Sequence, residues 1–105
     1  MTETELEVIS RYEAIARASA RMLEAARAGE WDSLLAAEAD CARRIEELRQ
    51  LGPGAPLSDS ARKRRVELLR RILADDAEVR ALTQPWLTTL EQFLNGHDMQ
   101  RRTYR

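Results

Sequence analysis

The chain has 105 residues, which is the size of one domain with a modest hydrophobic core. Aromatic residues make up only 5% of it, which argues against a β-sandwich or barrel, and the net charge of −1 excludes a globally basic nucleic-acid binder. One cysteine, Cys41, excludes a disulfide framework and a four-cysteine zinc site, and one histidine, His97, excludes a histidine-rich metal centre.

The amino end is acidic and lacks the basic and apolar regions of a signal peptide. Elsewhere, no apolar run approaches the roughly 20 residues that a membrane-spanning helix needs. We therefore expect a cytoplasmic protein with no membrane span.

Two helices are predicted in the first half of the chain, over residues 3–28 and 31–51. In both, apolar residues recur every three or four positions, which is the spacing of one buried helical face. Gly29 fits the position just beyond a helix end. Because only two residues separate the segments, they are expected to form an antiparallel helical hairpin.

The linker at residues 52–57 contains two prolines and two glycines, which favour a turn. A third, long helix is predicted over residues 58–94, where the apolar period continues. Asn95–Gly96 is typical of a helix end, so residues 95–105 are expected to form a polar tail. The helical spacing of apolar residues keeps the same phase before and after Pro85, which favours a kinked continuous helix over a break.

The third helix is expected to be longer than the first two, so part of its apolar stripe has no partner within the bundle. Large exposed apolar patches usually mark interaction sites, and we expect the free protein to bury this stripe in a homodimer or a crystal contact. Asp76 and Thr83 interrupt the stripe. Either Asp76 pairs with a neighbour such as Arg80, four residues on, or the stripe is open and receives another chain.

The residue types that usually carry catalysis are few and poorly placed. Cys41 lies mid-helix in phase with apolar residues, as a small buried side chain would, and His97 lies in the polar tail. Asp75 and Asp76 are adjacent in a helix, so their carboxylates point about 100° apart and do not converge on one substrate. We therefore expect no enzyme activity, no cofactor and no metal site.

Residues 62–71 form the strongest charge feature, with five arginines and one lysine. Such a segment can contact phosphate or an acidic protein surface. It is also what a solvated helix face looks like in a chain that has sixteen arginines and one lysine.

Two stretches are informative together: GEWDSLL at residues 29–35 and ILADDAEVRALTQPWLTTL at residues 72–90. With the length and the helix order, they make the chain similar to the FliT family of bacterial flagellar export chaperones over about residues 5–94. The resemblance implies an all-α fold in which an antiparallel hairpin and a long third helix form a three-helix bundle. Longer members carry a fourth helix that folds over the client groove. Residues 100–105 resemble its start, so most of that helix is expected to be absent.

The resemblance implies a cytosolic chaperone, without a cofactor, that binds the filament-cap protein FliD and keeps it soluble until type III export. It also implies contacts with the export ATPase complex, the export gate and the regulator FlhDC. Matching positions give Leu69, Val79, Arg80 and Tyr104 as client-binding residues, and the stripe adds Leu73 and Leu87. If these residues form a client site, Leu69, Val79 and Arg80 are at least partly exposed in the free bundle.

Two other functions stay open at this point. The protein can be a regulator that binds a transcription factor or nucleic acid through the basic face at residues 62–71. It can also be a purely structural coiled coil, although Pro85, Asp76 and the short hairpin argue against an uninterrupted heptad repeat.

Overall fold

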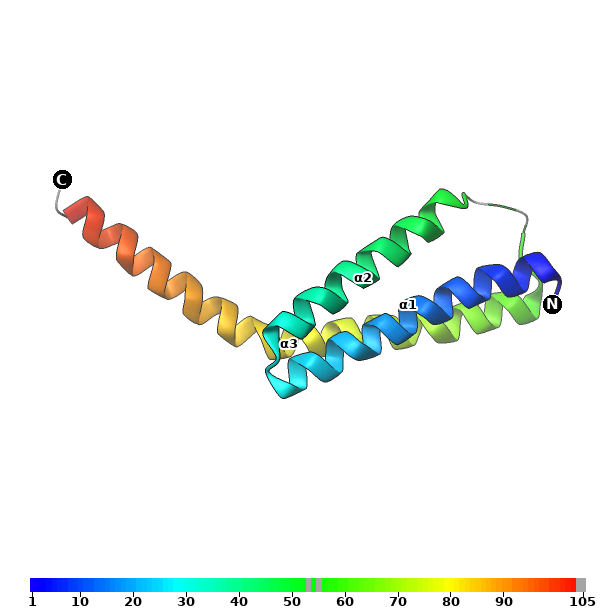
Figure 1. Ribbon diagram of the computed structural model, residues 1–105, viewed down its shortest axis with the longest axis horizontal. Coiled ribbons are helices and arrows are strands. Elements are labelled where there is room, and N and C mark those ends of the chain that lie inside the picture. The colour runs from blue at the N-terminus through cyan, green and yellow to red at the C-terminus, as the bar shows by residue number, and fades with distance from the viewer. Residues whose placement is uncertain (53, 55, 104–105) are drawn as a thin grey trace.

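The computed structural model of the protein consists of three α-helices: α1 (Glu3–Ala28), α2 (Trp31–Gln50) and α3 (Asp59–Thr103) (Figure 1). The structure describes residues 1–52, 54 and 56–103, and among these residues there is no β-strand. The all-α prediction is therefore confirmed. Each of the helix boundaries up to the start of α3 lies within one residue of the prediction.

The turn between α1 and α2 forms as the position of Gly29 predicts. Gly29 adopts the left-handed conformation, with φ of 69°. Its N–H donates to the carbonyl of Ala26, and the N–H of Glu30 donates to that of Ala25, at 3.2 and 3.0 Å. This pair of bonds is a Schellman motif, which satisfies the last carbonyls of α1 and turns the chain back at once. The result is the antiparallel hairpin.

The helix α3 is longer than predicted, because it does not stop at Asn95–Gly96 but continues to Thr103. The predicted polar tail at residues 95–105 is wrong to that extent, and residues 100–103 continue α3 instead of beginning a separate helix. The physical reason is that glycine ends a helix only when it adopts a left-handed conformation. Inside a helix it costs about 1 kcal/mol relative to alanine, which continued backbone hydrogen bonding can offset.

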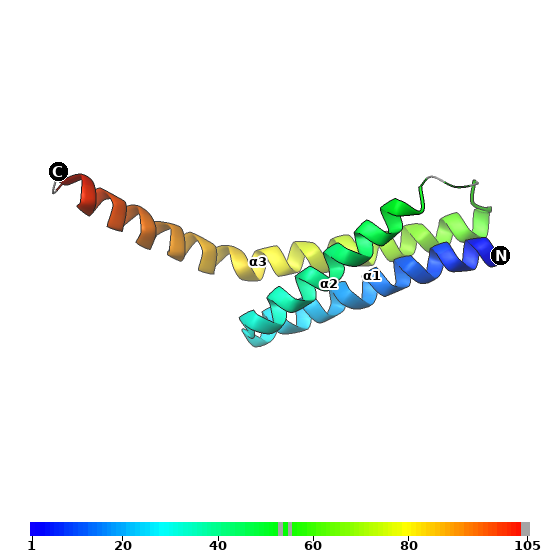
Figure 2. The ribbon, with the colours of Figure 1, turned by 45° about the horizontal axis from the view of Figure 1, so that its top comes forward.

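Pro85 lies inside α3, which is continuous as expected. A proline removes one backbone hydrogen bond and crowds the carbonyl four residues before it, which bends a helix. The helix changes direction where it leaves the hairpin, as Figures 1 and 2 show. Beyond this point, the hydroxyl of Thr89 donates to the carbonyl of Pro85 at 2.9 Å.

The hydrophobic core lies along α1, which packs against both other helices. Small residues of α1 allow this close approach, since Ala16 and Ala18 are almost completely buried. Leu68 of α3 is 1% exposed and packs in a cluster with Ile9 and Ala16. At the hairpin end, a second cluster joins all three helices through Leu23, Ala25, Ala26, Leu34 and Val79.

Cys41 is buried in a third cluster, with Ile15 and Ala18, as its phase predicts. Burial raises the pKa of the Cys41 thiol, and the carboxylates of Asp40 and Asp76 add to the effect. Because the thiolate is the reactive form, we expect Cys41 in the folded protein to react with iodoacetamide at least about tenfold more slowly than in urea-unfolded protein. Equal rates in the two states would show that Cys41 is accessible.

A carboxylate joins the amino ends of α1 and α3. Glu5 is 8% exposed and accepts hydrogen bonds from the backbone N–H of Ser58, at 2.7 Å, and of Thr2, at 3.1 Å. The Thr2 hydroxyl accepts from the N–H of Glu5, which completes a capping box at the start of α1. Hydrogen bonds from Ser58 and then from Thr2 lower the pKa of Glu5 to about 2.

Because the pKa of Glu5 is lower in the folded protein than its ordinary value of 4.5, its stabilising effect is present above about pH 4.5 and is lost as the pH falls towards 2. We expect Glu5→Gln to lower the melting temperature at pH 7 and to flatten the fall in stability between pH 4.5 and 2. Thermal melts at several pH values measure both effects. The control is Glu24→Gln, an exposed position with no hydrogen bond or ion pair among the described residues. An equal change in the control would contradict the role of Glu5.

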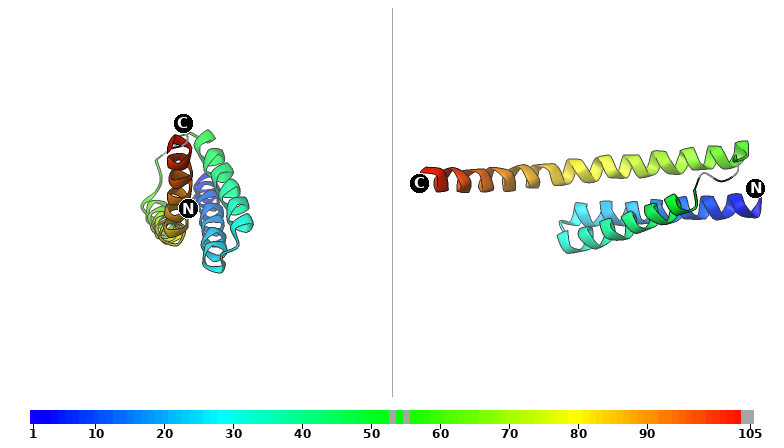
Figure 3. Two further views of the ribbon diagram at one scale, coloured as in Figure 1. Left: turned by 90° about the vertical axis from the view of Figure 1, so that its left-hand side faces the viewer. Right: turned by 90° about the horizontal axis from the view of Figure 1, so that it is seen from above.

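The carboxyl half of α3 projects beyond the hairpin, as expected from its length (Figure 3, right). The molecule is elongated, with extents of 66 × 28 × 20 Å. The projecting part carries exposed apolar residues: Leu90, Phe93 and Leu94. The homodimer stays a prediction.

Candidate functional site

Over the part of the chain that the structure describes, each of the helices α2 and α3 packs its backbone against α1 and not against the other. Among the described residues, the Cα atoms of α2 and α3 do not come within 8 Å of each other, although both helices pack against α1. Towards its carboxyl end α2 diverges from α1, as Figure 1 shows. Apolar side chains are left exposed there, with Ile45 of α2 at 42% and Leu51, just after α2, at 43%. The bundle is therefore closed at the hairpin end and open at the other.

The open end holds a cavity of about 1090 Å³ that all three helices and the linker line. Its apolar lining includes Val8 and Tyr12 of α1, Leu48 of α2, and Leu51 and Leu57 near the linker. Its charged lining consists of Glu5, Glu7, Arg49, Arg62 and Arg65. A mainly apolar hollow with a few charged groups at its edge is typical of a binding site.

Along α3, exposed apolar residues continue from the cavity towards the hairpin end. Leu69 is four residues after Arg65, and Leu73 is four after Leu69, so the three lie on neighbouring turns of one side of the helix. Leu69 is 37% exposed and Leu73 is 65% exposed. These two leucines, together with the cavity, define the surface that we call the α2–α3 groove.

The six client-binding residues expected from the sequence differ in their exposure in the structure. Leu69 is exposed, as expected, and Leu73 is exposed as well. Val79 is only 4% exposed and packs in the core, so the expectation that it is exposed is wrong. The reason is the phase of α3: Val79 lies eleven residues after Leu68, which is close to three full turns, and so points to α1 as Leu68 does. The side chain of Leu87 and all of Tyr104 lie outside the described part of the structure.

Arg80 is exposed, as expected, and its guanidinium pairs with Asp76 at 2.7 Å. Asp76 is thus satisfied by the residue four positions on, which is the first of the two readings of that residue. Asp75 lies on another side of the helix and accepts a hydrogen bond from the Ser19 hydroxyl of α1 at 3.2 Å. The two adjacent carboxylates therefore serve separate contacts.

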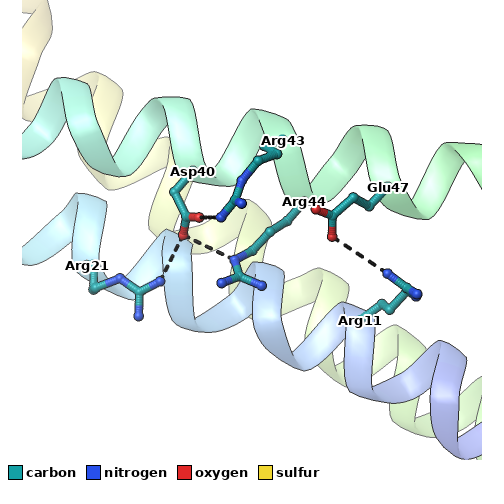
Figure 4. Close-up of polar contacts among 6 residues, drawn as sticks. All are labelled: Arg11, Arg21, Asp40, Arg43, Arg44 and Glu47. Atoms are coloured by element: carbon teal, nitrogen blue, oxygen red, sulfur yellow. Dashed lines mark hydrogen bonds and ion pairs between the residues drawn. The ribbon is translucent and has the colours of Figure 1, made fainter.

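An arginine cluster holds α2 to α1 near the middle of the hairpin (Figure 4). Asp40 of α2 accepts from Arg43 at 2.6 Å, from Arg21 of α1 at 3.0 Å and from Arg44 at 3.1 Å. The hydrogen bond from Arg43, followed by that from Arg44, lowers the pKa of Asp40 to about 2. Asp40 therefore stays ionised at any physiological pH, and the contact does not act as a pH switch.

The basic run at residues 62–71 does not form one face. Residues two apart on a helix point to nearly opposite sides, so Lys63 and Arg65 diverge. Arg62 and Arg65 line the cavity, whereas Lys63 is exposed and does not line it. Ion pairs already engage Arg62 with Asp59 and Arg64 with Glu67. This division disfavours a continuous phosphate-binding surface.

Two further features bear on the chemistry of the site. Among the described residues, no group of histidine, cysteine and acidic side chains is arranged to hold a metal ion. In the same part of the chain, no helix is both long and apolar enough to cross a membrane.

Comparison with known proteins identifies the family. A family model described as flagellar protein FliT matches residues 9–105. The chain belongs to the FliT family. The crystal structure of flagellar protein FliT from Bordetella bronchiseptica has a TM-score of 0.76 and 42% sequence identity, and the match covers 82% of this chain and 97% of that one. A comparison with curated proteins gives no match.

Membership in the FliT family supports a flagellar chaperone role and implies a flagellar export partner. The family is one of chaperone-type proteins and not of enzymes. The client-binding residues expected from the sequence include the exposed Leu69 and Leu73 but none of the cavity residues Tyr12, Leu48 and Arg65. The spacing of apolar residues alone does not show that α2 diverges from α1.

Proposed function

We propose that the protein is a cytoplasmic export chaperone that binds the filament-cap protein FliD and keeps it soluble until export. The observation that carries this proposal is the α2–α3 groove, in which a large cavity continues into exposed leucines on one side of α3. Family membership supplies the flagellar context.

The groove suits an amphipathic helix. Such a helix buries anchors at positions i, i+3, i+4 and i+7 in an apolar groove of a partner. Leu69 and Leu73 offer contacts one helical turn apart, and Leu48 and Leu51 offer contacts on the opposite wall. Covering the apolar face of the client in this way prevents its aggregation without ATP or metal chemistry.

Contacts with the export ATPase complex, the export gate and FlhDC are part of the same proposal. They rest on the family alone, because the described structure holds no surface that points to one of them in particular.

The experiment is a calorimetric titration of the purified protein with the carboxyl-terminal region of FliD from the same genome. We expect saturable one-to-one binding that weakens far less between low and high salt than phosphate binding does, since apolar contacts supply most of the affinity. A duplex DNA titrated in parallel serves as the control, for which phosphate binding would weaken linearly on a log–log salt plot. Binding of DNA without binding of FliD would contradict the proposal.

A further inference from the structure

Most of the charged groups around the cavity, but not all, have a hydrogen-bond or ion-pair partner among the described residues. Glu5 accepts hydrogen bonds from Ser58 and Thr2, and Glu7 pairs with Arg11 at 3.6 Å. Arg62 pairs with Asp59 at 2.6 Å, and Arg49 pairs with Glu46 at 3.5 Å. These four lining residues already have partners in the free protein.

Arg65 differs from the others. It is half-buried, lines the cavity, and has no hydrogen bond or ion pair among the described residues. A guanidinium is always charged and presents five donors in a planar fork that matches a carboxylate. Holding such a group at an apolar hollow without a partner leaves its charge without a counter-charge, which a bound acidic group would supply.

We infer that Arg65 binds a carboxylate side chain of the client helix, and that an aspartate or glutamate beside the apolar anchors of that helix sets its register in the groove. The inference rests on the proposed function and names the chemistry of the partner at the cavity end. Charge complementarity favours an acidic group as the binding partner. The two acidic residues that line the cavity already have partners, whereas Arg65 has none among the described residues. Leu69 lies four residues after Arg65, so an anchor on Leu69 places the neighbouring turn of the client beside the guanidinium.

The test is a charge swap between the protein and the carboxyl-terminal fragment of FliD. Arg65→Glu reverses the charge in the cavity. Lys63→Glu is the matched control, because Lys63 is exposed on the nearly opposite side of the same helix and also has no ion pair among the described residues. We expect Arg65→Glu to weaken binding at least about tenfold and Lys63→Glu to change it less than about twofold.

The fragment is then prepared with each of its acidic residues changed to lysine in turn. We expect one of these variants to bind Arg65→Glu protein within about threefold of the wild-type affinity and to bind wild-type protein weakly. If no lysine variant rescues, or if amidation of the terminal carboxyl of the fragment weakens binding as much as Arg65→Glu does, the inference is overturned. If circular dichroism shows that Arg65→Glu is unfolded, Arg65→Gln is combined with glutamine in place of each acidic residue of the fragment, and we expect one of these pairs to lose no more affinity than Arg65→Gln alone. Failure of the unmodified fragment to bind wild-type protein would instead overturn the proposed function.

Discussion

Val79→Asp is expected to destabilise the folded protein severely. Val79 is 4% exposed and belongs to the cluster that joins all three helices at the hairpin end. Placing an unpaired carboxylate there costs about 4 kcal/mol or more, against a total stability of about 5–15 kcal/mol for a typical domain. Urea unfolding followed by circular dichroism at 222 nm measures the change.

The control for this substitution is Leu73→Asp, in the same helix. Leu73 is 65% exposed, so an aspartate there stays hydrated, and we expect the free energy of unfolding to change by less than about 1 kcal/mol. If Val79→Asp were as stable as Leu73→Asp, the side of α3 that faces α1 would have to be assigned again.

The double substitution Leu69→Glu and Leu73→Glu is expected to abolish tight client binding while the helical fold is kept. Both side chains are exposed in the α2–α3 groove, and each central apolar contact in an interface contributes about 2 kcal/mol or more. Two such losses together weaken binding by more than about 100-fold. Titration calorimetry with the FliD fragment measures the dissociation constant.

A matched double variant tests the alternative surface on the projecting part of α3. Leu90→Glu and Leu94→Glu change two leucines that are 40% and 51% exposed, at the same four-residue spacing. We expect this variant to bind the client within about threefold of the wild-type protein, since peripheral positions contribute little. The opposite pattern, with the projecting pair essential and the groove pair neutral, would place the client site beyond the hairpin.

The sequence predicts the helices well because each has its own local signal. Gly29 marks the hairpin turn, and the three- and four-residue spacing identifies the face of α1 that packs in the core. It does less well where local and tertiary effects compete. Asn95–Gly96 carries the residues of a helix end, yet α3 continues, because an isolated glycine weakens a helix without forbidding it.

The site is less predictable than the fold, for a physical reason. The spacing of apolar residues places Leu69, Leu73 and Val79 among the apolar residues of α3, but it does not show which of them α1 covers. That depends on the crossing of the helices, which places Val79 in the core and leaves Leu73 in solvent. The cavity is harder still to predict, because it lies where α2 diverges from α1, and its lining residues come from four separate parts of the chain.

The measurement that tests the central claim most directly is methyl NMR of the protein labelled at leucine and valine, titrated with the FliD fragment. The groove account predicts that the signals of Leu48, Leu51, Leu69 and Leu73 shift on binding, while those of Leu90 and Leu94 stay in place. Shifts confined to Leu90 and Leu94 would show that the client binds the projecting part of α3 and would contradict the α2–α3 groove as its site.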